Sequence, residues 1–204
     1  MSVLVPPTAT KVLDVGCSVG VLASALRDRG HRVTGIEADG QLAQMARSSG
    51  NLEKLIEADV EQLARDGADP GGPFDCVVMA DVLEHLRDPW AVVRWASRVL
   101  GPDGSVVISV PNIRHLETFW SLLVKRRWPY KPVGIFDRSH LRWFAYGNLT
   151  DLLAGTDLQI AELNRTRSLV LNGSERINRL APYLGDLGTL QFIFRAEREG
   201  VRRG

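Results

Sequence analysis

The first half of this chain alternates short apolar runs with segments whose apolar residues have helical spacing. The apolar runs have the length of buried strands and occupy residues 12–15, 31–36, 54–58, 74–79 and 105–110. The helix-like segments between them cover residues 19–29, 41–48, 60–65 and 89–100. Connections this short leave few topologies other than right-handed β-α-β units on one parallel sheet. The pattern therefore predicts an α/β fold with a doubly wound, mostly parallel sheet and helices on both faces.

Two further strand-like runs, 158–164 and 189–196, lie in the last third of the chain, where no parallel crossover pattern is evident. We expect them to add an antiparallel pair at the C-terminal edge, which makes the sheet seven-stranded. A polar helix candidate between them begins at Ser174. The chain of 204 residues is 45% hydrophobic and shows neither a linker nor an internal repeat. It can bury a full core, and we expect a single domain over residues 1–204.

Charge and composition exclude several classes of protein. The formal net charge is +1, so no global field attracts nucleic acid or a membrane surface, and we expect neither as a partner. The first ten residues do not resemble a secretory signal, and no segment approaches the roughly 20 apolar residues of a membrane span. The two cysteines, Cys17 and Cys76, lack metal-ligand spacing and suit a reducing compartment. We therefore expect a cytoplasmic protein without a metal centre.

The first strand-like run ends in a glycine-containing turn, within the stretch KVLDVGCSVGVL at residues 11–22. In doubly wound sheets, ligands bind at the carboxyl ends of the strands, so this turn is the expected site. The dinucleotide pattern G-x-G-x-x-G does not fit, because Ser18 stands at its middle glycine and Val21 at its last. A phosphate-binding P-loop is excluded as well, since no lysine follows Gly20.

Four elements, taken in order, resemble the class I S-adenosylmethionine-dependent methyltransferases. They are DVGCSVG at 14–20, Glu37 after the second strand, Asp59 after the third, and FDCVVMADVLEHLRDP at 74–89. The last stretch is similar to the FDxVxxxxVLEHL motif of small-molecule methyltransferases in this class. The resemblance covers residues 11–110 closely and 111–155 more loosely, and Ser18 departs from it by replacing a glycine. It implies a Rossmann-like methyltransferase fold and S-adenosylmethionine as the cofactor.

The resemblance also implies a role for these positions. Asp14 would lie near the methionine amine, and Glu37 would accept hydrogen bonds from both ribose hydroxyls, although an acidic residue ending a strand is often only solvated. Asp59 would accept from the adenine amino group, but it can equally cap the helix that follows. The backbone after the fourth strand would hold the methionine amine. The implied cofactor-binding residues are Asp14, Gly16, Cys17, Ser18, Gly20, Glu37, Ala38, Asp59, Val60, Ala80 and Asp81.

Histidines are the candidate catalytic residues. Methyl transfer from a sulfonium mainly requires alignment and exclusion of water, but a hydroxyl acceptor benefits from a base near neutral pH. We expect His140 and His85 to be catalytic, with Asp137 three residues before His140 orienting its ring. Packing, capping or a turn contact is the alternative interpretation of each. His31 begins a strand at the opposite end of the sheet, and we expect it on the surface.

Residues 112–145 lie outside the strand pattern, and we expect this insertion to form a lid over the substrate. It holds three of the five tryptophans and seven basic residues against two acidic ones, a mixture that suits an acidic or aromatic acceptor. Within it, residues 119–123 are predicted to pack a helix onto the sheet, with Lys-Arg-Arg at 125–127 as its solvated end. Cover for the cofactor would come from this insertion or from the partner in a homodimer. The predicted substrate-binding residues are Asn112, His115, Arg142 and Trp143.

The leading hypothesis is a methyltransferase that acts on a hydroxyl of a small molecule, such as a sugar or a natural-product intermediate. Methylation of RNA or protein is an alternative, but the loop after the fourth strand reads MADV and lacks the N/D-P-P-Y/F pattern used for planar amino acceptors. A non-catalytic module that only binds S-adenosylmethionine is the other alternative, since a fold does not establish a function.

Overall fold

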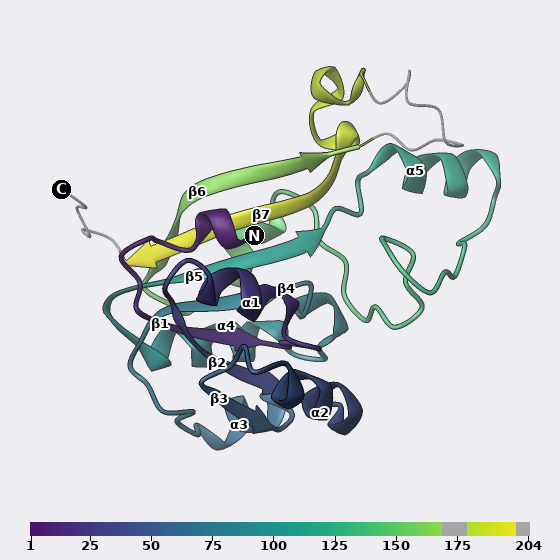
Figure 1. The fold of residues 1–204 in the computed structure, drawn as a ribbon. Coiled ribbons are helices and arrows are strands. Elements are labelled where there is room, and N and C mark those ends of the chain that lie inside the picture. The colour runs from purple at the N-terminus through teal and green to yellow at the C-terminus, as the bar shows by residue number, and fades with distance from the viewer. Residues whose placement is uncertain (169–178, 199–204) are drawn as a thin grey trace.

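The computed structural model describes residues 1–168 and 179–198, and its centre is a seven-stranded sheet (Figure 1). The strand order is β3-β2-β1-β4-β5-β7-β6. Neighbouring strands are parallel from β3 to β5, whereas β7 runs antiparallel to both β5 and β6. The predicted α/β fold with an antiparallel C-terminal edge is confirmed. The strands are β1 Lys11–Val15, β2 Arg32–Glu37, β3 Lys54–Glu57, β4 Phe74–Ala80, β5 Leu100–Pro111, β6 Leu158–Arg167 and β7 Thr189–Arg198.

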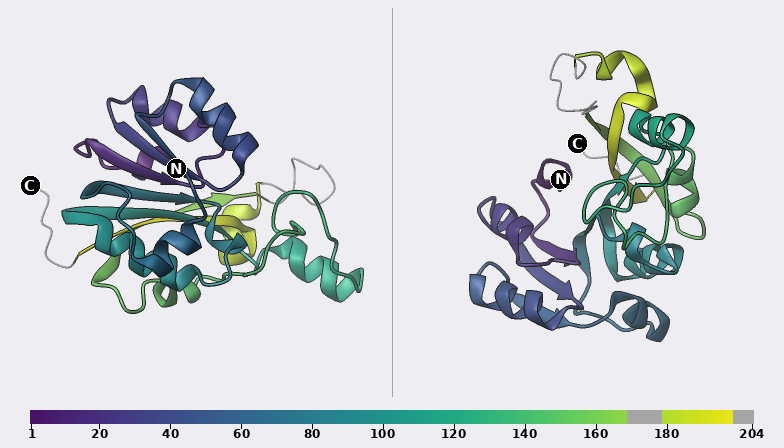
Figure 2. Two further views of the ribbon diagram at one scale, coloured as in Figure 1. Left: turned by 90° about the horizontal axis from the view of Figure 1, so that it is seen from below. Right: turned by 90° about the vertical axis from the view of Figure 1, so that its right-hand side faces the viewer.

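Helices follow most of the parallel strands and lie on both sides of the sheet (Figure 2). Their starts agree with local capping chemistry: Asp39, Asp59 and Asp88 each accept a hydrogen bond from a backbone amide in the first turn of the helix they precede. The α-helices are α1 Val21–Arg27, α2 Gly40–Ser49, α3 Val60–Asp66, α4 Pro89–Val99, α5 Leu116–Phe119 and α6 Asn148–Leu152. The 3-10 helical segments are η1 Ser2–Leu4, η2 Leu83–His85 and η4 Ala181–Gly188, and η3 Trp120–Val124 is π-helical.

Two hydrophobic clusters form the core, one on each face of the sheet. Because side chains alternate along a strand, neighbours in β1 face opposite clusters: Val12 packs in the cluster with α1, and Leu13 in the cluster with α3, α4 and α6. Trp95 of α4 and Phe74 of β4 are among the largest fully buried side chains. The parallel register sets Val15 beside Ile36 and Met79, so the carboxyl ends of β1, β2 and β4 meet at one edge.

The helical segment after β5 differs from the prediction. Helix α5 and the π-helical turn η3 project beyond the carboxyl end of the sheet (Figure 1). Phe119, Trp120 and Leu122 are 38% to 44% exposed and Leu123 is 73% exposed, so the prediction that these side chains pack on the sheet is wrong. The chain leaves β5 at the end of the sheet, and no strand lies beneath the projecting segment in the part of the chain that the structure describes.

His31 also differs from the prediction. It lies at the amino end of β2 as expected, but it is only 3% exposed, and its Nδ1 lies 2.6 Å from the carbonyl oxygen of Ala9. The N-terminal segment that packs on the sheet therefore covers it. No helix within residues 1–168 and 179–198 is both long and apolar enough to cross a membrane. Residues 174–178, where the predicted polar helix begins, are not among the described residues.

Candidate active site

The turn after β1 has a backbone that only small residues tolerate. Gly16, Ser18 and Gly20 have φ angles of 68°, 50° and 83°, all in the left-handed region. A Cβ atom on Gly16 would lie 2.6 Å from Cγ2 of Val82, so no larger residue fits without a shift of the loop after β4. Ser18 adopts the conformation that a glycine would adopt freely, at a cost of about 1 kcal/mol. The turn therefore retains the shape of the motif despite the substitution.

Glu37 joins the loops that follow β1 and β2. One carboxylate oxygen accepts a hydrogen bond from the backbone amide of Ser18 at 2.9 Å, and the other accepts from the amide of Asp39 at 2.9 Å. Each oxygen keeps a second lone pair for a further donor. Glu37 therefore both organises the turn and offers the two acceptor positions that vicinal hydroxyls require.

Asp14 lies beneath this turn as a buried carboxyl group. Its side chain is 1% exposed, and Oδ2 has no hydrogen-bond partner among the residues that the structure describes. Burial, with the negative charge of Glu37 as the second cause, raises the pKa of Asp14 to about 7. Burial and then the charge of Asp14 raise the pKa of the neighbouring Cys17 thiol to about 12, so this thiol is neutral. A cationic group that reached Asp14 would find an acceptor without a partner.

A cleft of about 470 Å³, hereafter the cofactor cleft, opens beside the turn. Its walls bring together seven of the predicted cofactor-binding residues, namely Gly16, Ser18, Glu37, Ala38, Asp59, Val60 and Asp81. The other four, Asp14, Cys17, Gly20 and Ala80, do not line it. Asp59 accepts a 2.7 Å hydrogen bond from the amide of Glu61, and thereby caps α3. It also lines the cleft, so its position suits both helix capping and cofactor binding.

A second cavity of about 310 Å³, hereafter the acceptor cavity, adjoins the cofactor cleft. The two spaces share Asp81 and His85, which lie in the segment after β4. One oxygen of Asp81 accepts hydrogen bonds from Ser109 on β5, at 2.9 Å, and from Gln191 on β7. The lining residues of the acceptor cavity are Asp81, Glu84, His85, Pro111, Val133, Gly134, Ile135, Asp137, His140, Leu190 and Gln191.

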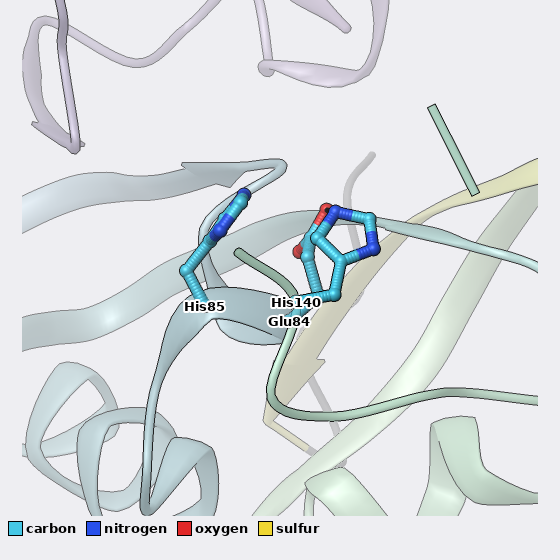
Figure 3. Close-up of side chains that lie close together, drawn as sticks. All are labelled: Glu84, His85 and His140. Carbon is cyan, nitrogen blue, oxygen red and sulfur yellow. Dashed lines mark ion pairs between the residues drawn. The ribbon is translucent and has the colours of Figure 1, made fainter. Parts of the chain in front are cut away.

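Glu84, His85 and His140 form a compact cluster at the wall of the acceptor cavity (Figure 3). Glu84 and His85 belong to η2, whereas His140 comes from the long segment after β5. The two imidazole rings meet edge to face with their centroids 4.8 Å apart, and Nε2 of His140 lies 4.0 Å from Oε1 of Glu84. Burial raises the pKa of Glu84 to about 8, and burial, followed by the charge of His85, lowers the pKa of His140.

Ser139 connects Asp137 to His85. Its hydroxyl oxygen lies 2.6 Å from Oδ1 of Asp137 and 3.2 Å from Nδ1 of His85. The hydrogen bonds from the Ser139 hydroxyl and backbone amide lower the pKa of Asp137, so this carboxylate only accepts. Ser139 therefore donates to Asp137 and accepts from Nδ1–H of His85, which leaves Nε2 of His85 with a free lone pair. We predicted that Asp137 orients His140, but this hydrogen-bonded chain leads to His85.

The four predicted substrate-binding residues line neither the cofactor cleft nor the acceptor cavity. The side-chain nitrogen Nδ2 of Asn112 donates to the backbone carbonyl oxygens of Asp186 and Thr189 at 2.7 and 2.8 Å. His115 caps α5, with Nε2 2.6 Å from the carbonyl oxygen of Ser168. Arg142 donates to the carbonyl oxygens of Leu141 and Arg87, and Trp143 packs edge to face on Trp128 at 5.9 Å. Val133 and Gln191 line the acceptor cavity instead, and Ser139 contacts His85 at its wall; sequence reasoning missed all three.

The fold and the cofactor cleft define a class I S-adenosylmethionine-dependent methyltransferase. The donor set fits this cofactor, because carboxylates at three places offer acceptors for an ammonium group, two hydroxyls and an adenine edge. The family model described as "Methyltransferase domain" matches residues 3–163, and the chain belongs to that family. The cofactor is therefore S-adenosylmethionine.

Curated relatives and solved structures agree with this assignment. A ubiquinone biosynthesis O-methyltransferase of Xanthomonas oryzae is 38% identical over 107 residues, which cover 50% of this chain and 43% of that protein. The matched stretch thus spans less than half of that relative. The enzyme of the same name from Vibrio parahaemolyticus is 28% identical over 173 residues, 83% of this chain and 72% of that protein.

The solved structures support the fold. An S-adenosylmethionine-dependent methyltransferase from Archaeoglobus fulgidus superposes with a TM-score of 0.64 at 16% identity, covering 94% of this chain and 87% of that one. Magnesium protoporphyrin IX methyltransferase from Synechocystis, with bound S-adenosylhomocysteine, gives a TM-score of 0.65 at 18% identity, covering 92% and 74%.

Proposed function

We propose that this chain transfers the methyl group of S-adenosylmethionine to a hydroxyl oxygen of a small, uncharged acceptor. The observation that carries the proposal is the junction of the two spaces at Asp81 and His85. A cofactor in the larger cleft would present its methyl group toward this junction, and a molecule in the acceptor cavity would approach it from the other side. Such an arrangement suits an in-line displacement at carbon.

The charge of the acceptor cavity favours a neutral acceptor. Asp81 and Asp137 line it as carboxylates, Glu84 is neutral below its raised pKa of about 8, and no lysine or arginine belongs to the described lining residues. An anionic molecule there would face carboxylates without a compensating cation. The acidic acceptor suggested by the basic residues of 112–145 is therefore not what the cavity favours. Those basic side chains lie outside the described lining.

The cofactor supplies an activated methyl group, so the chain's own residues have to align the acceptor and manage its proton. His85 lies at the junction, with Nδ1 engaged by Ser139 and Nε2 free to accept the proton of a hydroxyl group. Asp137 fixes this tautomer through Ser139 and stabilises the imidazolium that forms. His140 packs against the His85 ring and limits its orientation.

We further propose that residues 1–204 form one domain and that the segment 112–145 is its lid. Val133, Gly134 and Ile135 line the acceptor cavity together with Asp137 and His140, so the segment would cover a bound acceptor and exclude water. The curated relatives are named O-methyltransferases, which supports oxygen as the atom methylated. A cytoplasmic location and a homodimer are further proposals, and sedimentation of the purified chain tests the dimer.

Calorimetry with S-adenosylhomocysteine, followed by turnover of labelled S-adenosylmethionine, tests the proposal. The acceptor panel should contain neutral phenols and sugars, carboxylated analogues of both, RNA and protein. We expect turnover of neutral hydroxylated molecules, and a loss of about a hundredfold in kcat for His85→Ala. Asp103→Asn, at an exposed position near the start of β5, is the control and should keep full activity. Binding without turnover of any acceptor, or methylation of RNA or protein alone, would contradict the proposal.

A further inference from the structure

We propose that Glu84, His85 and His140 bind one divalent cation at the wall of the acceptor cavity. Each residue offers one ligand atom, and these atoms all lie within 4.8 Å of one another. Figure 3 shows the carboxylate of Glu84 and the ring of His140 side by side, with His85 beside them on the same turn as Glu84. Carboxylate oxygen and imidazole nitrogen are the protein ligands of catalytic zinc sites.

Unsatisfied buried atoms support the site independently of the spacing. Oε2 of Glu84 and Nδ1 of His140 have no hydrogen-bond partner in the described part of the chain. The Glu84 side chain is 2% exposed and that of His140 is 6% exposed. A buried polar atom without a partner is unfavourable because it has lost its hydrogen bonds to water, and a charged group loses more. A cation would offset this cost by ligating both residues.

The donor set selects the kind of cation. Calcium takes six to eight oxygen ligands and magnesium keeps mostly water and oxygen, whereas imidazole favours zinc and its transition-metal neighbours. One carboxylate and two imidazoles around zinc would leave a fourth position open toward the cavity. Ligand bonds of about 2.1 Å place tetrahedral neighbours roughly 3.4 Å apart, so the cluster has to contract by about an ångström. The exposed His85 ring is the part most free to move.

A second set of residues already orients one ligand. The hydroxyl of Ser139 engages Nδ1 of His85, and Asp137 in turn accepts from that hydroxyl. Ligating histidines commonly have their other ring nitrogen held in this way, which fixes the tautomer. Nε2 of His85 is therefore the atom available to a cation.

The consequence for catalysis rests on the proposed function, although the site itself does not. With a cation bound, Nε2 of His85 is a ligand and no longer accepts a proton. An acceptor hydroxyl in the fourth position would have a lowered pKa, as water on zinc does. Its O–H bond breaks and the proton leaves to solvent water. The oxygen keeps the electron pair and attacks the methyl carbon, and the breaking C–S bond returns its electrons to sulfur to give S-adenosylhomocysteine.

Titration of the chelator-treated chain of residues 1–204 with Zn²⁺ tests the inference by calorimetry. We expect one ion per chain, and at least roughly tenfold weaker binding for Glu84→Gln and for His140→Gln, provided that circular dichroism shows both variants folded. Glu53→Gln changes an exposed carboxylate at the other end of the sheet, and its affinity should equal that of the wild type. Co²⁺ should give the visible absorption of a tetrahedral complex in the wild type and in Glu53→Gln, but not in Glu84→Gln or His140→Gln.

The outcomes separate this inference from the proposed function. A folded wild-type chain that binds neither ion, or a Glu84→Gln variant that binds with unchanged affinity, would overturn the cation site. Full turnover by the metal-free chain together with an absence of binding would overturn the site and leave the proposed function standing. Binding of Zn²⁺ at the three residues without any methyl transfer would support the site and contradict the proposed function.

Discussion

Asp14 should couple the binding of the cofactor to pH. Its carboxyl group is 1% exposed, and burial together with the charge of Glu37 raises its pKa to about 7. Below that pH the free protein therefore holds Asp14 mostly protonated. We expect the ammonium group of the cofactor or its demethylated product to favour the ionised carboxylate and return its pKa to about 4. Binding then releases a proton.

The size of the effect follows from proton linkage. With pKa values of about 7 in the free and about 4 in the bound protein, the affinity falls roughly fortyfold between pH 7 and pH 5, or about 2.2 kcal/mol. Near pH 6, about one proton leaves for each ligand bound.

The ionisation of Asp14 also makes the free energy of unfolding depend on pH. Because the pKa of Asp14 is higher in the folded protein than in the unfolded chain, its stabilising contribution is complete below about pH 4 and is lost as the pH rises through about 7.

Calorimetry with S-adenosylhomocysteine in two buffers of different ionisation enthalpy measures both the affinity and the proton released. Asp14→Asn should bind more weakly at pH 7 and show no pH slope between pH 5 and pH 7. Asp59→Asn changes a carboxylate on the surface of the cofactor cleft, and it should lower the affinity while leaving the slope intact. A wild-type affinity that is constant over this range, or a slope that persists in Asp14→Asn, would refute the reasoning.

Three further substitutions test other parts of the site. Ser18→Gly should raise the free energy of unfolding by about 1 kcal/mol, because it relieves a φ of 50°, and a denaturant titration that shows no gain would argue against strain in the turn. Ser139→Ala should lower kcat about tenfold without changing the affinity for S-adenosylhomocysteine, since it interrupts the link to His85; an unchanged kcat would remove Ser139 from the mechanism. Asn112→Ala should lower the free energy of unfolding by about 2 kcal/mol by leaving buried backbone carbonyls unpaired, whereas a raised KM for the acceptor at unchanged stability would restore its predicted substrate role.

The strands could be predicted because their signals are local. Apart from Asp75, the run at 74–79 is apolar, as expected for a strand buried on both faces, and β4 extends from Phe74 to Ala80. The prediction that residues 119–123 pack on the sheet was wrong because packing depends on tertiary structure and has no local signal. The apolar residues at 119–123 have helical spacing, but that spacing does not reveal whether a sheet lies beneath the helix. Whether this helix covers the sheet depends on the position and direction of the chain where it leaves β5.

The same distinction divides the site residues. Those in the cofactor cleft follow directly after strands, so the parallel topology alone brings Gly16, Glu37 and Asp59 to one edge. The residues of the acceptor cavity come together only through tertiary structure. Ser139 contacts His85 across a separation of 54 residues, and Gln191 contacts Asp81 across 110. Neither separation corresponds to a period of a helix or a strand, so no local pattern predicts these pairs.

The carboxylates of the acceptor cavity lead to a last prediction, which connects the proposed preference for a neutral acceptor with the proposed cation site. A cation at Glu84, His85 and His140 would add two positive charges to a cavity that Asp81 and Asp137 make negative. A unit charge at roughly 5 Å acts with about 3 kcal/mol at an effective dielectric constant of 20, and solvent reduces this in an open cavity. Loading with Zn²⁺ should therefore raise kcat/KM for a carboxylated acceptor relative to its neutral analogue by at least about tenfold. Paired acceptors assayed with and without the ion measure that ratio. If the ratio stays constant or falls, no cation bound in this cavity governs which acceptor the protein uses.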